Sequence, residues 1–497
     1  MILIKHFPVL QVLSPLFGAL FSILTFRYIF ITRIIVILSI GLSLILSIYG
    51  LSAINAPLMY NFGNWAAPIG IEYKLDYLSQ PLIIYINGVI LFYLIFCNKL
   101  IKETVLEFID KKRRSLFYAI LLFAHAGYLG ILSTNDLFNL YVFIEISSLS
   151  TYVLMAQGNN PKAAIGAFDY LILGTIGATL ILIAIGFLLS YTGSLNMTDI
   201  SGLLKSNYHS KTIVISISFF LIGALLKTAL FPMHFWMIRA YYSVAPVMLI
   251  YITGISSIVG IYIVLRFIHC VIDYNVIINI FPYFIKPIAL SAITLCTYFA
   301  LKGQKIKNII IYSATAQIGY VFLLLGIPQG ENIIFPFLLA DSLNKIALFL
   351  IITISDLYGY AHLKKVGLLW RFLVGFNLIC SCGLPISGMF IIKLTIIELL
   401  LLKKLWVEFI VIIISSCLAY LYHYKIAKKL FFEENRPLEL RKSSNVSKYI
   451  SDSIPSSLNH YGLTIISIGQ AILVIYLGRL QIFYNMVVNN TLLGLGG

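Results

Sequence analysis

Long apolar runs separated by short polar segments repeat along the whole chain. A helix that crosses a bilayer needs about 20 mostly apolar residues, and most of these runs are near that length. The pattern therefore predicts an all-α integral membrane protein with about fourteen transmembrane helices. The expected spans are 7–25, 34–54, 75–97, 115–133, 136–156, 162–191, 212–235, 241–268, 276–300, 306–328, 332–354, 368–400, 404–424 and 459–488.

The composition excludes a soluble fold of this length. Of the 497 residues, 60% are hydrophobic and 11% are charged, whereas charged residues make up roughly a quarter of ordinary soluble domains. A soluble protein of this size would have too little polar surface to cover such a core. We therefore predict a multi-pass protein of the cell inner membrane.

The excess of basic residues is concentrated in alternate loops. The chain has 35 Lys and Arg residues against 19 Asp and Glu residues, a net charge of +16. Most basic residues fall in the loop after the first span and in every second loop thereafter, including the run 111–114. Cytoplasmic loops carry such an excess, so we expect both termini on the non-cytoplasmic side and no nucleic-acid partner.

The sequence contains no recognisable cofactor or metal site. The six cysteines all lie in apolar runs, without the paired spacings typical of zinc or iron–sulfur sites. No glycine-rich nucleotide-binding motif follows a strand. We therefore predict no cofactor and no metal.

Three lysines remain inside predicted spans once the loop residues are set aside. An ionisable side chain at membrane depth costs about 2.5–3.5 kcal/mol, so such residues are functional candidates that need polar partners or water. Burial favours neutral lysine and a nearby carboxylate favours charged lysine, so a Glu–Lys pair whose separation changes can load and release a proton. Alternatively, the charges only hold helices together, a role more often filled by Ser, Thr and Asn. The candidates are Lys227, Lys345 and Lys393, with Glu145, Asp169, Asp341 and Glu398 as intramembrane acids.

Two of these lysines lie beside signals for a broken helix. Pro232 follows about one turn after Lys227, and Pro385 precedes Lys393 in a glycine-containing segment. A proline frees a backbone carbonyl, which at membrane depth must be satisfied by protein or by water in a cavity. Broken helices at matching positions in two halves are typical of inverted-repeat transporters, although simple kinks give the same pattern. His234, just after Pro232, could join a proton path or be an ordinary buried histidine.

We therefore expect two inverted repeats of five helices each, near spans 4–8 and 9–13, with the seventh and twelfth helices broken. The predicted organisation is 1–114 for the N-terminal helices, 115–268 for the first repeat, 276–430 for the second repeat, and 431–497 for a loop and the last helix.

Several segments resemble the motifs of a known transporter family. Residues 136–145, which end at Glu145, resemble the fifth-helix motif of the D-type subunits of the Mrp multisubunit cation/proton antiporters. The wider superfamily includes the antiporter-like membrane subunits of NADH–quinone oxidoreductase, respiratory complex I. Other segments resemble the seventh-, tenth- and twelfth-helix motifs, and two loop segments resemble the Mrp branch in particular. These segments are 227–236, 307–320 and 383–393, followed by 63–71 and 192–197.

The resemblance implies roles for individual residues. Glu145 and Lys227 would form the charge pair that drives proton movement, and Lys393 would be the exit-side proton site. We assign Lys345 to the same proton relay. The possible auxiliary residues are Asp341, Asp169 and His234.

The sequence also differs from the family pattern, at residues 237–239 after the seventh-helix motif and at three single positions. In the eighth helix Ile258 occupies the place of the usual Lys or His. In the eleventh helix Asp341 replaces a common histidine, and its spacing from Lys345 permits an i,i+4 ion pair. Asp169 stands where a basic residue is common.

We therefore expect a proton-translocating subunit of a multisubunit antiporter that exchanges Na⁺ or another monovalent cation for protons. Its expected partners are other membrane subunits, lipid, protons and the cation. One alternative is a proton-pumping subunit of a NADH–quinone oxidoreductase complex. Another is a structural subunit without transport, which Ile258 leaves open.

Overall fold

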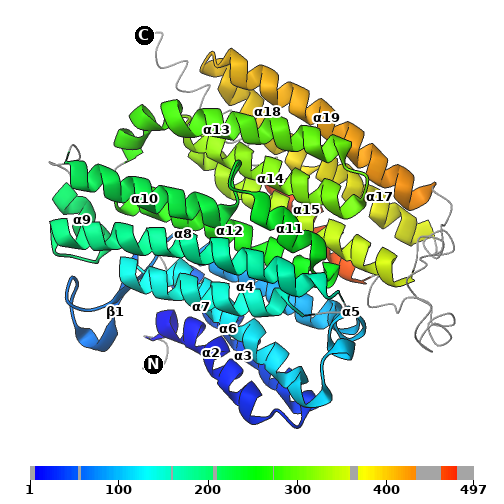
Figure 1. Cartoon of the computed structure of the whole chain (residues 1–497), viewed down its shortest axis with the longest axis horizontal. Helices are drawn as coiled ribbons and strands as arrows, with labels where there is room; N and C mark the ends of the chain where they lie inside the picture. Colours follow the sequence, from blue (N-terminus) through cyan, green and yellow to red (C-terminus); the bar gives the residue numbers. More distant parts are fainter. Residues whose placement is uncertain are drawn as a thin grey trace. The chain divides into compact units, whose positions relative to one another are not determined.

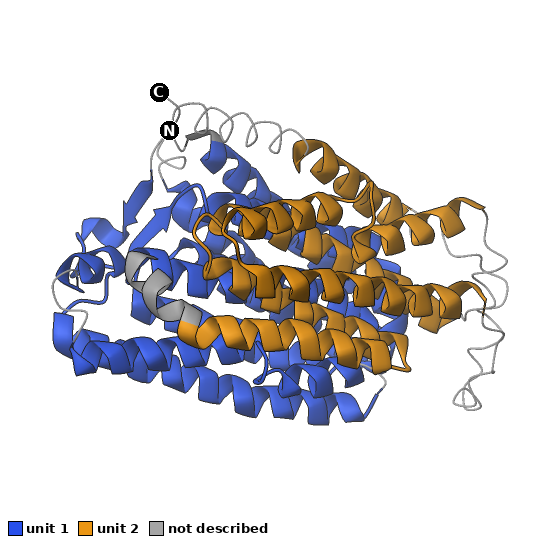
Figure 2. Ribbon diagram, turned by 90° about the horizontal axis from the view of Figure 1, so that it is seen from above, with its two compact units in different colours: residues 1–280 blue, residues 281–497 orange. Residues whose placement is uncertain are grey.

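The computed structural model describes residues 6–53, 57–157, 160–204, 210–272, 274–358, 368–432 and 461–477. The chain divides into two compact units, residues 1–280 and residues 281–497 (Figure 2). The division falls close to the expected start of the second repeat at residue 276. The repeat symmetry itself, and the domain bounds, stay predictions.

The first unit is built from long apolar helices with short connecting elements (Figure 1). The long helices are α2 (Phe7–Leu24), α3 (Ile29–Ala53), α4 (Ser79–Phe96), α6 (Arg114–Ser133), α7 (Leu137–Met155), α8 (Lys162–Thr192), α10 (Lys211–Thr228) and α12 (Pro246–Cys270). The short elements are β1 (Leu58–Asn61), β2 (Glu72–Leu75), α5 (Asn98–Thr104), α9 (Met197–Leu204), α11 (Phe235–Ser243) and the single 3₁₀ turns Phe62–Asn64, Leu106–Phe108 and Lys111–Arg113.

Helix α13 (Tyr274–Lys302) begins at the end of the first unit, and the remaining helices form the second. These are α14 (Ile306–Leu325), α15 (Glu331–Tyr358), α17 (Leu368–Cys382), α18 (Gly388–Leu402) and α19 (Trp406–Phe431), followed by an apolar helix at Tyr461–Leu477. In this unit α15 packs against α14, α17 and α18, and α19 packs against α14, α17 and α18.

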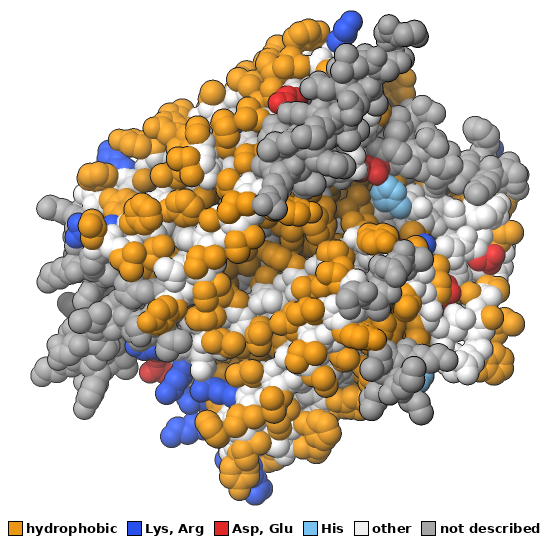
Figure 3. Space-filling model, turned by 180° about the vertical axis from the view of Figure 1, so that it is seen from behind, with side chains coloured by type: hydrophobic (Ala, Val, Ile, Leu, Met, Phe, Trp, Pro, Cys, Tyr) orange, Lys and Arg blue, Asp and Glu red, His pale blue; other side chains and the backbone are white. Residues whose placement is uncertain are grey.

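The all-α membrane class is confirmed. Twelve helices among the described residues are long and apolar enough to cross a membrane, and hydrophobic side chains cover most of the face drawn in Figure 3. The two other expected spans contain shorter helices, because 368–400 divides into α17 and α18 and the last helix is described only to Leu477. The count of fourteen therefore stays a prediction.

The two predicted helix breaks are present. Helix α10 ends at Thr228, where Ala229 adopts a left-handed conformation with φ 57°, and α11 begins only at Phe235. Helix α17 ends at Cys382 and α18 begins at Gly388. Pro232 lies inside the first interrupted segment and Pro385 inside the second. Proline has no backbone N–H to donate within a helix, which explains an interruption at these positions.

Small residues allow helices α8 and α10 of the first unit to approach closely. Helix α8 packs against α10, and a Cβ atom built on Gly223 would lie 2.5 Å from the carbonyl oxygen of Gly177. Close backbone approach through glycine is a usual way for membrane helices to associate, since lipid provides no hydrophobic drive between them. This contact positions the end of α10, where Lys227 lies.

Gly223→Val should therefore lower the thermal unfolding temperature of the purified protein, because overpacking costs about 1–3 kcal/mol. Gly186→Val is the matched control, since a Cβ atom on Gly186 in α8 meets nothing within 4 Å. An equal loss of stability in both variants would contradict the proposed role of this contact.

Candidate functional site

Lys227 is held by neutral hydroxyl groups of the neighbouring helix. Its Nζ atom donates to Ser148 Oγ over 2.7 Å and to Tyr152 OH over 3.5 Å. Both partners lie on α7, and both are more than 90% buried. A hydroxyl oxygen can accept from an ammonium and its own proton can rotate away, so these groups satisfy Lys227 without carrying charge.

Glu145 shares the α7 face that contacts Lys227. Residues 145, 148 and 152 are spaced by three and four positions, which places them on one side of a helix. Glu145 is half-buried and acts electrostatically on Lys227. Among the ion pairs of the described residues, however, none joins Glu145 directly to Lys227, so the expected charge pair has a hydroxyl contact in place of a salt bridge.

Aromatic side chains pack around the helix break that follows Lys227. Trp236 Nε1 donates to the Leu226 carbonyl oxygen over 3.0 Å, which satisfies a carbonyl at the end of α10. The Trp236 ring stacks on Tyr170 with centroids 4.1 Å apart. His234 is buried beside Phe231 and Phe235, with ring centroids 5.1 Å and 4.6 Å away. A side-chain donor thus reaches the backbone at the break, as membrane depth requires.

The other first-unit candidates lie apart from the Lys227 contacts. Asp169, near the start of α8, forms an ion pair with Arg239 over 3.8 Å, and the Arg239 side chain is 73% exposed. Ile258 is fully buried in α12. The nearby Ser257 hydroxyl donates to the Thr253 carbonyl within the same helix.

In the second unit, Asp341 and Lys345 form the expected ion pair within α15. Lys345 Nζ lies 2.5 Å from Asp341 Oδ2, and both side chains are less than 9% exposed. The pair borders a cavity of about 20 Å³, which also reaches α14, α17, α18 and α19. Its other polar lining residues are Ser313, Gln317, Asn344, Ser381 and His423.

Lys393 lies in the second turn of α18, which follows the break that contains Pro385. Its side chain is buried, and its Nζ atom is 6.0 Å from the centroid of the Tyr320 ring. Gly383 has a left-handed φ of 78°, and a Cβ atom there would lie 3.3 Å from Lys393 Nζ. The glycine therefore provides both the backbone turn and the space beside the ammonium.

A buried carboxylate outside the predicted spans ties three loops of the first unit together. Glu72 Oε2, at the start of β2, accepts from Asn135 Nδ2 and Asn196 Nδ2, each over 2.9 Å. Asp136, beside Asn135, caps α7 by accepting from the Asn139 N–H over 2.7 Å. Burial raises the pKa of Asp136, while the N–H groups at the start of α7 lower it. This network positions the helix that carries Glu145, Ser148 and Tyr152.

A second polar pair anchors the same loop region. Arg266 near the end of α12 forms a salt bridge with Asp76, and its side chain is 2% exposed. Burial alone would raise the pKa of Asp76, but the Arg266 guanidinium and hydrogen bonds from Ser79 hold it below the usual value of 3.8. Arg266 falls within the expected span 241–268, and the sequence did not identify its partner because the two residues are far apart in the chain.

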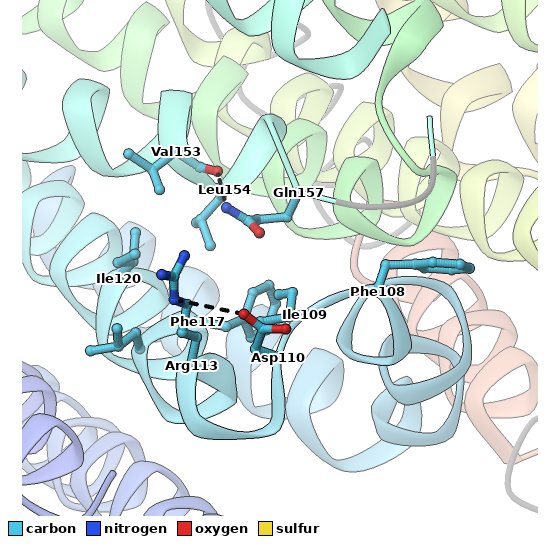
Figure 4. Close-up of a pocket in the computed structure, with 10 residues that line it drawn as sticks. Phe108, Ile109, Asp110, Arg113, Phe117, Ile120, Val153, Leu154 and Gln157 are labelled. Atoms are coloured by element: carbon cyan, nitrogen blue, oxygen red, sulfur yellow. Dashed lines mark hydrogen bonds and ion pairs between the residues drawn. The ribbon is translucent and has the colours of Figure 1, made fainter. Parts of the chain in front are cut away.

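The larger described cavity, of about 290 Å³, lies elsewhere in the first unit. It is lined by residues near the ends of α6 and α7, where Arg113 and Asp110 form an ion pair over 3.9 Å and Gln157 donates to the Val153 carbonyl (Figure 4). None of the intramembrane lysines or acids lines it.

Comparison with known proteins identifies the family. The model of the transmembrane region described as NADH:quinone oxidoreductase/Mrp antiporter matches residues 134–419, more than half of the chain. The chain belongs to this NADH:quinone oxidoreductase/Mrp antiporter family. The match contains the Lys227, Lys345 and Lys393 sites.

Relatives come from both branches of the antiporter family. The N-type subunit of the NADH-quinone oxidoreductase of Desulforudis audaxviator is 30% identical, over 86% of this chain and 87% of the relative. The D-type subunit of the Na(+)/H(+) antiporter of Alkalihalophilus pseudofirmus is 26% identical, over 90% of this chain and 91% of the relative. A chain in the structure of the Mrp complex from a Dietzia species has the same fold, with a TM-score of 0.83 and 19% identity over 97% of this chain and 96% of that one.

Asp76→Asn should lower the free energy of unfolding by about 3–5 kcal/mol at neutral pH, because it leaves the buried Arg266 charge unpaired. Since the folded-state pKa of Asp76 lies below 3.8, the stabilisation from the pair is present above that pH and is lost as the pH falls further. Thermal unfolding between pH 7 and 3 measures both effects. Asp110→Asn, whose side chain is 80% exposed in its pair with Arg113, should change stability by less than about 0.5 kcal/mol.

Proposed function

We propose that this chain is the proton-translocating membrane subunit of a multisubunit antiporter that exchanges a monovalent cation, such as Na⁺, for protons. The proposal draws on its family, on the relatives named as D-type subunits of Na(+)/H(+) antiporters, and on the charges inside its helices. Its partners in this proposal are the other membrane subunits of the same complex.

The observation that carries the proposal is the environment of Lys227. The ammonium contacts Ser148 and Tyr152, while Glu145 lies on the same face of α7. A nearby Glu145 favours protonated Lys227, and a larger separation favours release of the proton. The neutral hydroxyls of Ser148 and Tyr152 can accept from the ammonium form of Lys227 or donate to its neutral amine form. Loss of the proton therefore leaves no unpaired carboxylate in contact with Lys227.

The broken helix makes a change in this separation physically reasonable. Lys227 lies in the last turn of α10, ahead of the segment that separates α10 from α11. A short rotation of this end would move Nζ relative to Glu145 without breaking a continuous helix. Lys345 and Lys393 in the second unit are the proposed later proton acceptors.

A relay of this kind can exchange energy with the membrane potential. One elementary charge that crosses 100 mV is worth about 2.3 kcal/mol, which is comparable with the about 2.5–3.5 kcal/mol cost of placing a charged lysine at membrane depth. The proposed location is the cell inner membrane, with both termini on the non-cytoplasmic side. In the proposed topology, successive loops alternate between the two sides of the membrane, which places the loops of Glu72, Asn135 and Asn196 on the non-cytoplasmic side. The hydrogen bonds among these three residues support that assignment.

A second candidate function is proton pumping in a NADH–quinone oxidoreductase complex. The 30% identity to an N-type subunit of such a complex, over most of both chains, favours it, whereas the Mrp-like segments 63–71 and 192–197 favour antiport. Affinity purification from native membranes with identification of the bound subunits decides between them. Mrp-type partners support the antiporter, and quinone-oxidoreductase partners support the pump.

Lys227→Ala should abolish proton flux in everted vesicles that contain the complex, because no other group takes its place between Ser148 and Tyr152. A pH-sensitive dye reports the flux, and immunoblotting checks that the variant still inserts. Lys211→Ala, an exposed lysine at the other end of α10, should leave the flux near the wild-type value. Normal flux in Lys227→Ala would overturn the proposal.

Ser148→Ala should reduce proton flux by roughly tenfold or more, because a hydrogen bond to a charged group is worth about 1.5–3 kcal/mol. Ser147→Ala is the matched control, since the Ser147 hydroxyl donates to the Ile144 carbonyl within its own helix over 3.0 Å. The vesicle assay with equal amounts of inserted protein compares them. Equal flux in the two variants would show that the Ser148 contact has no role in transport.

A further inference from the structure

The cavity of about 290 Å³ in the first unit lies at the ends of α6 and α7 that are expected at the cytoplasmic face. Its volume is near the lower end of the range of about 300–1,000 Å³ for small-molecule sites. The polar side chains around it are Asp110, Arg113 and Gln157, and apolar residues of both helices complete its walls (Figure 4). A few polar groups on an apolar wall are the usual composition of a ligand site.

The two charged groups of the cavity are of opposite sign and bind each other only loosely. Arg113 Nε and Asp110 Oδ2 are 3.9 Å apart, and the two side chains are 75% and 80% exposed. A charge-assisted hydrogen bond is shorter, at about 2.7–2.9 Å. The Asp110 side chain also makes no capping hydrogen bond to the 3₁₀ turn that follows it. Because an exposed pair of this kind contributes little to stability, a ligand can separate the two charges at low cost.

Two rows of apolar side chains lead from the cavity into the membrane. Helices α6 and α7 pack against each other and are joined by a short connection, so they run antiparallel. The row on α6 is Leu116, Ile120 and Phe123, and the row on α7 is Val153, Leu149 and Ile146. Steps of three or four residues keep each row on one side of its helix, and seven residues of helix rise about 10 Å. All of these side chains are exposed or half-buried, so they offer an apolar surface to lipid acyl chains.

The charges of the cavity match a headgroup that carries both signs. A phosphate can accept from the Arg113 guanidinium, which suits phosphate oxygens. The Gln157 amide donates one hydrogen to the Val153 carbonyl over 3.3 Å, and its second hydrogen is available to the same phosphate. A primary ammonium can donate to the Asp110 carboxylate, whereas an anionic headgroup without an amine would bring a second negative charge beside Asp110.

We propose that this cavity binds the headgroup of one phosphatidylethanolamine molecule, with its phosphate on Arg113 and its ammonium on Asp110. The acyl chains lie along the two apolar rows of α6 and α7. The two-carbon link between the phosphate and the amine lets one headgroup contact both side chains. The site does not involve Lys227 and does not depend on the proposed transport function.

Native mass spectrometry of the purified full-length chain in detergent measures the affinity for this lipid. Phosphatidylethanolamine, phosphatidylglycerol and phosphatidylcholine with identical acyl chains are added in turn, and the wild type should bind one phosphatidylethanolamine more tightly than either of the others. Arg113→Gln should weaken that binding by roughly tenfold or more, because a hydrogen bond to a charged group is lost.

Lys112→Gln is the matched control, because it removes the same charge from the same turn and Lys112 does not line the cavity. It should weaken binding by less than about twofold, as expected for an exposed charge. An equal loss in Lys112→Gln and Arg113→Gln would show a general attraction to the basic segment and would overturn the proposal.

Asp110→Asn tests the identity of the headgroup. This variant should lose the preference for phosphatidylethanolamine over phosphatidylglycerol, because the ammonium loses its partner while the phosphate keeps Arg113. An unchanged preference would overturn the assignment. Phosphoethanolamine without acyl chains should bind at least about tenfold more weakly than the lipid, because it buries no apolar surface on the two rows; equal binding would exclude a lipid site.

A photoreactive phosphatidylethanolamine, with a diazirine in its acyl chain, tests the site in the whole complex in vesicles. Peptides of α6 and α7 should be labelled in the wild type and labelled less in Arg113→Gln. Absence of this label, with cross-links from the same face to another subunit, would show that protein covers the cavity and would overturn the proposal.

Discussion

The requirement that a buried positive charge have a polar partner organises the functional regions of both units. At membrane depth no bulk water is present to solvate an ammonium, so the protein must supply hydrogen-bond acceptors from neighbouring helices. Lys227 receives them from Ser148 and Tyr152 of α7, and Lys345 receives a carboxylate from its own helix. The helix packing that brings α7 to the end of α10 is therefore inseparable from the chemistry of Lys227.

The helix breaks follow from the same requirement applied to the backbone. Carbonyl groups at the end of an interrupted helix need donors, and at the first break the indole of Trp236 donates to Leu226, which also accepts from the Ala229 N–H. The ring stacking of Trp236 on Tyr170 fixes that donor against α8. A break stabilised by one side chain can rearrange at less cost than a continuous helix, because fewer backbone hydrogen bonds need to change together.

Hydropathy and proline positions predicted much of the fold, whereas the partners of the buried charges had to come from the structure. An apolar run of about 20 residues has few alternatives to a spanning helix, and a lysine within it is conspicuous. Ser148 and Tyr152 carried no such signal beyond their spacing from Glu145, since hydroxyl residues are common in membrane helices. The pairing of Glu72 with Asn135 and Asn196 depends on loops that are distant in sequence, so only the packed helices bring them together.

The different partners of Lys227 and Lys345 indicate different consequences of deprotonation. When Lys227 loses its proton, the contacting hydroxyls remain neutral and can donate to the amine, so the site stays satisfied. When Lys345 loses its proton, Asp341 is left as an uncompensated buried anion at 2.5 Å from a neutral amine. The first arrangement suits a group that only passes protons, because either protonation state is tolerated. The second arrangement holds the ammonium beside its carboxylate, because loss of either charge would leave the other buried without a counter-charge.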